Sequence, residues 1–136
     1  MSAAERAVAE REDLQAVAME KARALARAIG ESAAYKAFRR AHGALMEDDT
    51  LRRRFYAYQA QRQEVEFARR AGSAEPAQEA ALEEEWRVLS AIPILQAYLE
   101  GQRELTALLK EMVTILNAEF GVDYGAVCTP PGSCCG

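Results

Sequence analysis

Histidine and cysteine, on which many catalytic and metal sites depend, are scarce in this sequence of 136 residues. It has one His and three Cys, and residues 1–127 contain no Cys. A Ser-His-Asp or Cys-His arrangement needs a histidine to accept a proton, and only His42 is available. Because His42 falls on an apolar helical stripe between Phe38 and Leu45, we interpret it as a structural residue. We therefore expect a protein that is not an enzyme.

Other chemical motifs are missing as well. The glycines are isolated rather than gathered in a phosphate-binding loop. A carboxylate di-metal bundle needs a Glu-x-x-His motif, but Arg39 stands three residues before His42. Lys+Arg 17 against Asp+Glu 21 give a net charge of −4, which argues against direct nucleic-acid binding. Basic runs at 39–40 and 52–54 flank acidic residues 47–49, which weaken any shared positive patch.

Long hydrophobic runs are also lacking. The N-terminus has no apolar segment of the kind that signal peptides carry. The most apolar stretch, Leu89–Leu99, is interrupted by polar residues and is too short for a bilayer, which needs about 20 residues. We expect a soluble cytoplasmic protein without membrane contact, in which thiols stay reduced.

What the sequence does contain is helix-forming residues with apolar side chains at helical spacing. These stripes predict helices over residues 4–29, over 32–46 with Ser32 as N-cap, and from Asp48 or Asp49 to about residue 71. The stripes on the long helices are broad, so a second subunit would bury more of them than one chain can. We therefore expect a homodimer or higher homo-oligomer.

Two prolines mark helix boundaries or a kink in the second half of the chain. Pro76 is expected to open a fourth helix, and Pro93 either kinks this helix or begins a fifth one that ends before Gly121. No segment alternates with a period of two for long enough to predict a strand. The fold class is therefore all-α, with about five helices in an elongated antiparallel bundle or hairpin arrangement. Residues 1–121 form the oligomerisation and interaction domain, and residues 122–136 form an irregular tail.

That tail holds all three cysteines, Cys128, Cys134 and Cys135. Thiolates are preferred ligands of zinc and of iron–sulfur clusters, and the intervening Pro-Pro-Gly can fold the chain back on itself. The C-x5-C-C spacing matches neither a standard zinc site nor a ferredoxin, and three thiols are one short of the usual four. Metal or cluster binding, with a further ligand from elsewhere, and a disordered tail with free thiols both remain open.

Several segments resemble the YlbF/YmcA family of small helical bacterial regulators, which is related to YheA-like proteins. The resemblance covers roughly residues 20–136 and includes the tail cysteines, which are typical of the YlbF-like branch. It rests on these stretches: Ala-Leu-Ala-Arg-Ala-Ile-Gly-Glu-Ser at 24–32, Tyr-Lys-Ala-Phe at 35–38, Glu-Asp-Asp at 47–49, Ile-Pro-Ile-Leu-Gln-Ala-Tyr-Leu-Glu at 92–100 and Glu-Leu-Thr-Ala-Leu-Leu at 104–109.

The resemblance implies a non-enzymatic regulator that forms homo- or hetero-oligomers. Members of the family act with related helical regulators and a YaaT protein in a complex that influences RNase Y and mRNA processing, and through it competence, sporulation and biofilm formation. That complex carries [4Fe–4S] clusters, so the resemblance makes Cys128, Cys134 and Cys135 candidate cluster ligands here. A helical scaffold with a chemically idle tail, and a zinc-binding module, are the alternatives.

Overall fold

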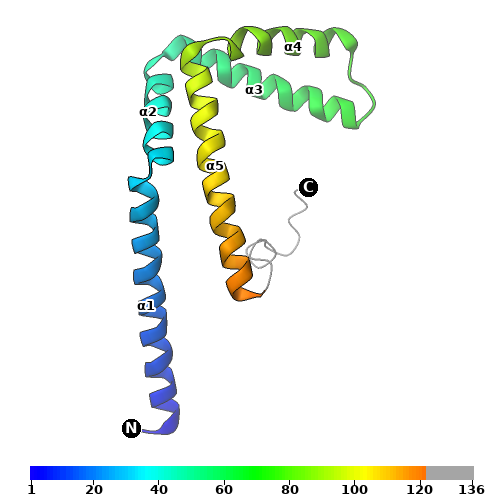
Figure 1. Cartoon of the computed structure of the whole chain (residues 1–136). Coiled ribbons are helices and arrows are strands. Elements are labelled where there is room, and N and C mark those ends of the chain that lie inside the picture. Colours follow the sequence, from blue (N-terminus) through cyan, green and yellow to red (C-terminus); the bar gives the residue numbers. More distant parts are fainter. Residues whose placement is uncertain (122–136) are drawn as a thin grey trace. The chain divides into compact units, whose positions relative to one another are not determined.

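The computed structural model describes residues 1–121, and within them the chain is entirely helical apart from short turns (Figure 1). The prediction of an all-α fold with five helices is confirmed. The helices are α1 (Ala3–Glu31), α2 (Ala33–Glu47), α3 (Asp49–Arg70), α4 (Pro76–Ser90) and α5 (Pro93–Phe120). None of them is long and apolar enough to cross a membrane.

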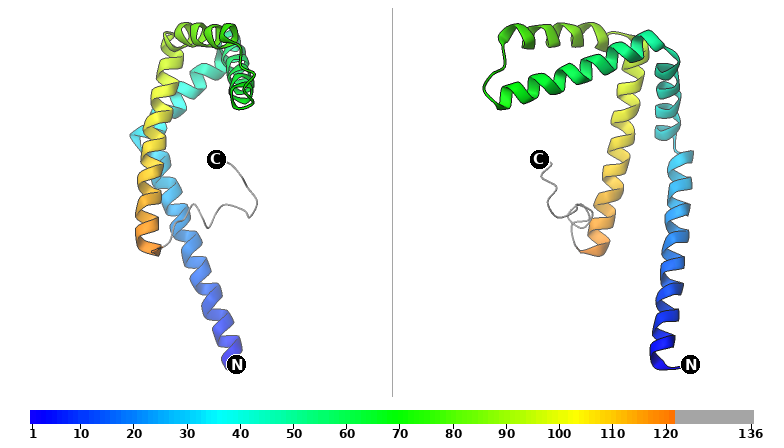
Figure 2. Two further views of the ribbon diagram at one scale, coloured as in Figure 1. Left: turned by 90° about the vertical axis from the view of Figure 1, so that its right-hand side faces the viewer. Right: turned by 180° about the vertical axis from the view of Figure 1, so that it is seen from behind.

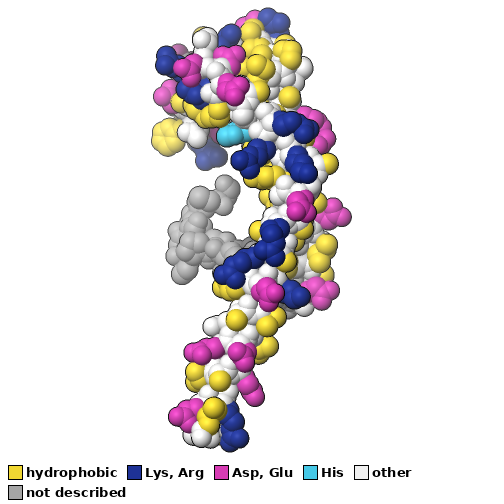
Figure 3. Space-filling model, turned by 90° about the vertical axis from the view of Figure 1, so that its left-hand side faces the viewer, with side chains coloured by type: hydrophobic (Ala, Val, Ile, Leu, Met, Phe, Trp, Pro, Cys, Tyr) yellow, Lys and Arg dark blue, Asp and Glu magenta, His cyan; other side chains and the backbone are white. Residues whose placement is uncertain are grey.

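The chain divides into two compact units, Met1–Lys36 and a second that starts at Ala37, and each is described by itself. The first unit is dominated by α1, which begins with a reciprocal cap. The Ser2 hydroxyl accepts a hydrogen bond from the Glu5 N–H at 3.2 Å, and the Glu5 carboxylate accepts one from the Ser2 N–H. None of the residues of α1 is buried. Hydrophobic and charged side chains are mixed along its surface (Figure 3).

The core of the second unit lies where α2, α3, α4 and α5 meet. Leu45, Leu89 and Leu95 have an exposed fraction of 1% or less, and Leu51, Phe55 and Tyr58 complete the buried cluster. Burial of one such side chain stabilises a fold by roughly 1.5–3 kcal/mol. The helices α3 and α4 lie side by side as an antiparallel hairpin, and α5 leaves the end of this hairpin in a different direction (Figures 1 and 2).

A glycine allows α2 and α5 to approach closely. A Cβ atom added at Gly101 would lie 2.9 Å from the Cα of Phe38, closer than such atoms come in proteins. Next to this contact, the rings of Phe38 and Tyr98 lie 5.7 Å apart, and Tyr98 meets Phe55 edge-on at 6.0 Å. Aromatic contacts therefore link α5 to both α2 and α3.

The helix ends follow the predicted signals. Asp48, one of the two expected caps, accepts a hydrogen bond from the Leu51 N–H at 2.9 Å and starts α3. Of the two alternatives for Pro93, the structure shows the second, because Pro93 is the first residue of a separate helix. Gly121 ends that helix with a φ of 66°, in the left-handed region that favours glycine.

Candidate functional site

The three cysteines predicted as ligands, Cys128, Cys134 and Cys135, lie outside the described residues. The structure describes the chain up to Gly121, which terminates α5 seven residues before the first of these thiols. Within residues 1–121, no group of three or more His, Cys, Asp or Glu side chains is placed to hold a metal ion. The candidate ligands predicted from the sequence therefore stay a prediction.

His42 lies in an aromatic group at the α2–α5 contact. Its ring is stacked on Phe38 at a centroid distance of 5.8 Å and lies 6.1 Å from Tyr98. The side chain of His42 is otherwise exposed, and its structural role stays a prediction.

Ion pairs engage an arginine of the basic run 52–54 and another near the end of α3. Arg52 pairs with Asp49 at 2.6 Å within α3, and Arg69 pairs with Glu79 of α4 at 2.9 Å. These guanidinium groups are thus partly neutralised where they stand. The arrangement agrees with the expectation that acidic neighbours weaken a shared positive patch.

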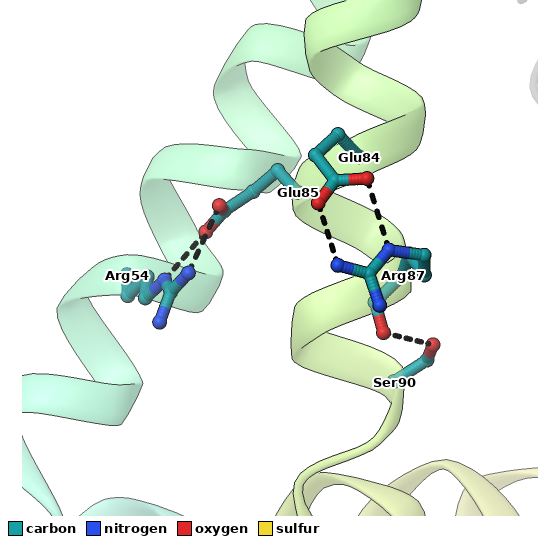
Figure 4. Close-up of polar contacts among 5 residues, drawn as sticks. All are labelled: Arg54, Glu84, Glu85, Arg87 and Ser90. Carbon is teal, nitrogen blue, oxygen red and sulfur yellow. Dashed lines mark hydrogen bonds and ion pairs between the residues drawn. The ribbon is translucent and has the colours of Figure 1, made fainter.

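The strongest polar contact between α3 and α4 joins Arg54 to Glu85 (Figure 4). The guanidinium donates two hydrogen bonds to the carboxylate, with Nε–Oε1 and Nη2–Oε2 distances of 2.6 and 3.0 Å. These bonds lower the pKa of Glu85 and raise that of Arg54. Glu85 therefore points toward α3 at the surface of the hairpin and stays partly exposed.

Trp86 lies at the edge of the hairpin and is partly exposed, whereas Leu89, three residues further along α4, is buried. The exposed fraction of Trp86 is 36%, and one face of its ring is stacked on the buried Tyr58 at a centroid distance of 5.3 Å and an interplanar angle of 23°. Two shallow hollows flank it, of about 550 and 350 Å³. Helical periodicity could not reveal this position, since it does not show which residues of α3 lie opposite Trp86.

The helices described above match a known protein family. The family model described as "Control of competence regulator ComK, YlbF/YmcA" matches residues 18–119, three quarters of the chain. The chain belongs to the YlbF/YmcA family. The matched range runs from the second half of α1 to the last turn of α5. The resemblance seen in the sequence is thereby confirmed.

Membership of the YlbF/YmcA family assigns the chain to a group of competence regulators. The match leaves residues 1–17 and the cysteine-bearing tail outside its range. Searches of curated proteins and of solved structures give no match.

Proposed function

We propose that this chain is a non-enzymatic cytoplasmic adaptor of the YlbF/YmcA type that works through protein partners. In this role it assembles with itself, with related helical regulators and with a YaaT-like protein, and the complex influences mRNA processing by RNase Y. The observation that carries the proposal is the family match over residues 18–119. Competence, sporulation and biofilm formation are the processes that such a complex would affect.

The surface of α1 supports self-assembly. Large hydrophobic side chains along this helix are between 42% and 71% exposed: Val8, Leu14, Val17, Met19 and Leu25. A helix in water gains most of its stability when its apolar face packs against a partner. Exposed apolar side chains of this kind are available for a protein–protein contact.

The charges along α1 favour a second copy of this chain as its partner. The first half of the helix, residues 3–16, has four acidic and two basic residues, whereas residues 17–31 have three basic and two acidic ones. Two such helices in antiparallel orientation would place each acidic half beside a basic half. A two-fold symmetric dimer has this self-complementary arrangement.

The tail supplies the ligands for the cofactor in this proposal. Cys128, Cys134 and Cys135 have the thiolate chemistry that iron–sulfur clusters require, and a [4Fe–4S] cluster commonly has four thiolate ligands. The fourth ligand would come from an assembled partner, so that cluster binding would require assembly. A bound cluster would make the complex responsive to electrons and oxidants, while the chain itself provides the thiolates and the surfaces that hold the assembly.

Metal and sulfide analysis tests the cofactor. The protein is purified anaerobically, alone and co-expressed with its partner proteins, together with a variant in which Cys128, Cys134 and Cys135 are all changed to serine. We expect iron and acid-labile sulfide in the wild-type complex and neither in the variant. Stoichiometric zinc without colour would identify a zinc-binding module instead. Absence of all three elements in every preparation would leave a helical scaffold with an idle tail.

A further inference from the structure

The α3–α4 hairpin presents an aromatic surface that the proposed cluster does not use. Tyr58, with an exposed fraction of 8%, covers one face of the Trp86 ring. The exposed third of Trp86 therefore belongs to its other face and its edges, and Trp86 lines both hollows. A tryptophan that is half covered and half open supplies a preformed binding face, because the buried tyrosine fixes the plane of its ring.

The charged groups that line these hollows do not balance. They comprise three carboxylates and two guanidinium groups, which leaves one negative charge. Both arginines are already engaged. Arg87 donates hydrogen bonds of 2.9 and 2.6 Å to Glu84, and Arg69 donates one of 2.9 Å to Glu79. Glu83 lines both hollows and has no ion pair within residues 1–121.

Helical spacing places this carboxylate beside the open ring. Glu83 precedes Trp86 by three residues in α4, so the two side chains lie on neighbouring positions of one helix face. The nearby Glu84 is directed along α4 to Arg87, while Glu85 is turned to Arg54 of α3 (Figure 4). The neighbouring ion pairs thus leave Glu83 as the carboxylate available to an incoming cation.

We propose that Trp86 and Glu83 form a docking site for an arginine side chain in an exposed basic segment of a protein partner. The guanidinium would lie over the open face of Trp86 and form an ion pair with Glu83. Arginine suits the site better than lysine, because a planar guanidinium stacks on an aromatic ring and still donates hydrogen bonds at its edge. This inference rests on the proposed adaptor function and assigns one of its partner surfaces.

The chain carries its own reporter for the test. Trp86 is its sole tryptophan, so intrinsic fluorescence comes from the proposed site. The full-length protein is titrated with a capped tetra-arginine peptide and, separately, with the same peptide made of citrulline, the uncharged isostere of arginine. We expect saturable quenching by the arginine peptide, weaker binding as salt is raised, and no saturable change with the citrulline peptide.

Two variants and a matched control define the contacts. Glu83→Gln keeps the side-chain shape and removes the charge, and it should weaken binding by about threefold. Glu64→Gln removes an exposed carboxylate on α3 that has no ion pair within residues 1–121, and it should leave the affinity unchanged. Trp86→Leu, measured by anisotropy of a labelled peptide, should weaken binding by about threefold to fivefold.

Several results would overturn the docking site. They are the absence of saturable quenching by the arginine peptide, equal quenching by the citrulline peptide, or equal effects of the Glu83 and Glu64 substitutions. A shift in Trp86 fluorescence with protein concentration alone would assign the surface to a second copy of this chain. The titration is repeated on the variant without tail cysteines, so that loss of the cluster and loss of peptide binding are scored separately.

Discussion

The helices of the two compact units are stabilised in different ways. The helix α1 has an N-terminal capping box and many alanines but no buried residue, whereas the helices of the second unit surround leucines that are fully enclosed. Local preferences favour α1, and tertiary packing holds α3, α4 and the first half of α5. The second unit packs within itself, whereas the apolar side chains of α1 are exposed.

The largest expected effect is the difference in unfolding free energy between alanine variants of one leucine from each unit. Leu89 is 0% exposed, so Leu89→Ala should lower the free energy of unfolding by about 2–5 kcal/mol. Leu14 is 71% exposed, so Leu14→Ala should change it by less than about 0.5 kcal/mol in the monomer. Urea denaturation followed by circular dichroism, at dilute protein concentration, measures both. Equal losses would mean that α1 is packed within its own chain.

Two glycines of the second unit test how closely α2 and α5 approach each other. Gly101→Ala forces a methyl group against the Phe38 backbone and should destabilise the protein by about 1–3 kcal/mol. Gly43 has nothing within 4 Å of an added Cβ, so Gly43→Ala should stabilise α2 by about 0.5–1 kcal/mol. Thermal unfolding of the two variants gives the comparison. Opposite signs are expected, and a stabilising Gly101→Ala would contradict the close approach of α2 and α5.

The N-caps provide the next contrast. Asp48→Ala removes the acceptor for the Leu51 N–H and should lower global stability by about 1 kcal/mol, because α3 is part of the core. Ser2→Ala should fray the first turn of α1 and leave the main unfolding transition in place. Chemical denaturation reports the first effect, and amide hydrogen exchange near the N-terminus reports the second. A shared shift of the main transition would show that the units unfold together.

The smallest effect concerns the ion pair between α3 and α4. The pKa of Glu85 lies below its ordinary value of 4.5 because Arg54 donates hydrogen bonds to it. Its stabilising contribution is therefore present above pH 4.5 and is lost as the pH falls through the lower, folded-state pKa. Denaturation midpoints measured across this range should fall less in Glu85→Gln than in wild type. The control Glu64→Gln should follow wild type.

The sequence was sufficient for features that depend on neighbours along the chain. Backbone preferences of single residues predicted the cap at Ser32, narrowed the cap of α3 to Asp48 or Asp49, and left a kink or a new helix as the alternatives at Pro93. The helix-forming stripes gave the number of helices for the same reason.

Features that depend on a distant residue could not be predicted in this way. Glu85 points toward α3 because it pairs with Arg54, and Gly101 matters because Phe38 lies across from it. The partial cover of Trp86 by Tyr58 depends on how α3 packs on α4, and helical spacing contains no such information. The candidate ligands Cys128, Cys134 and Cys135 remain a prediction from the tail sequence and the family resemblance.

Hydrogen exchange as a function of protein concentration tests most directly whether self-assembly buries α1. If α1 is buried by self-assembly, its amides exchange rapidly in dilute protein and become protected as the concentration rises. Over the same range, core amides of α3 and α4 keep constant protection. Equally high protection of α1 at every concentration would contradict burial of α1 by assembly. Exchange of α1 that stays rapid in concentrated protein with its partners present would contradict it as well.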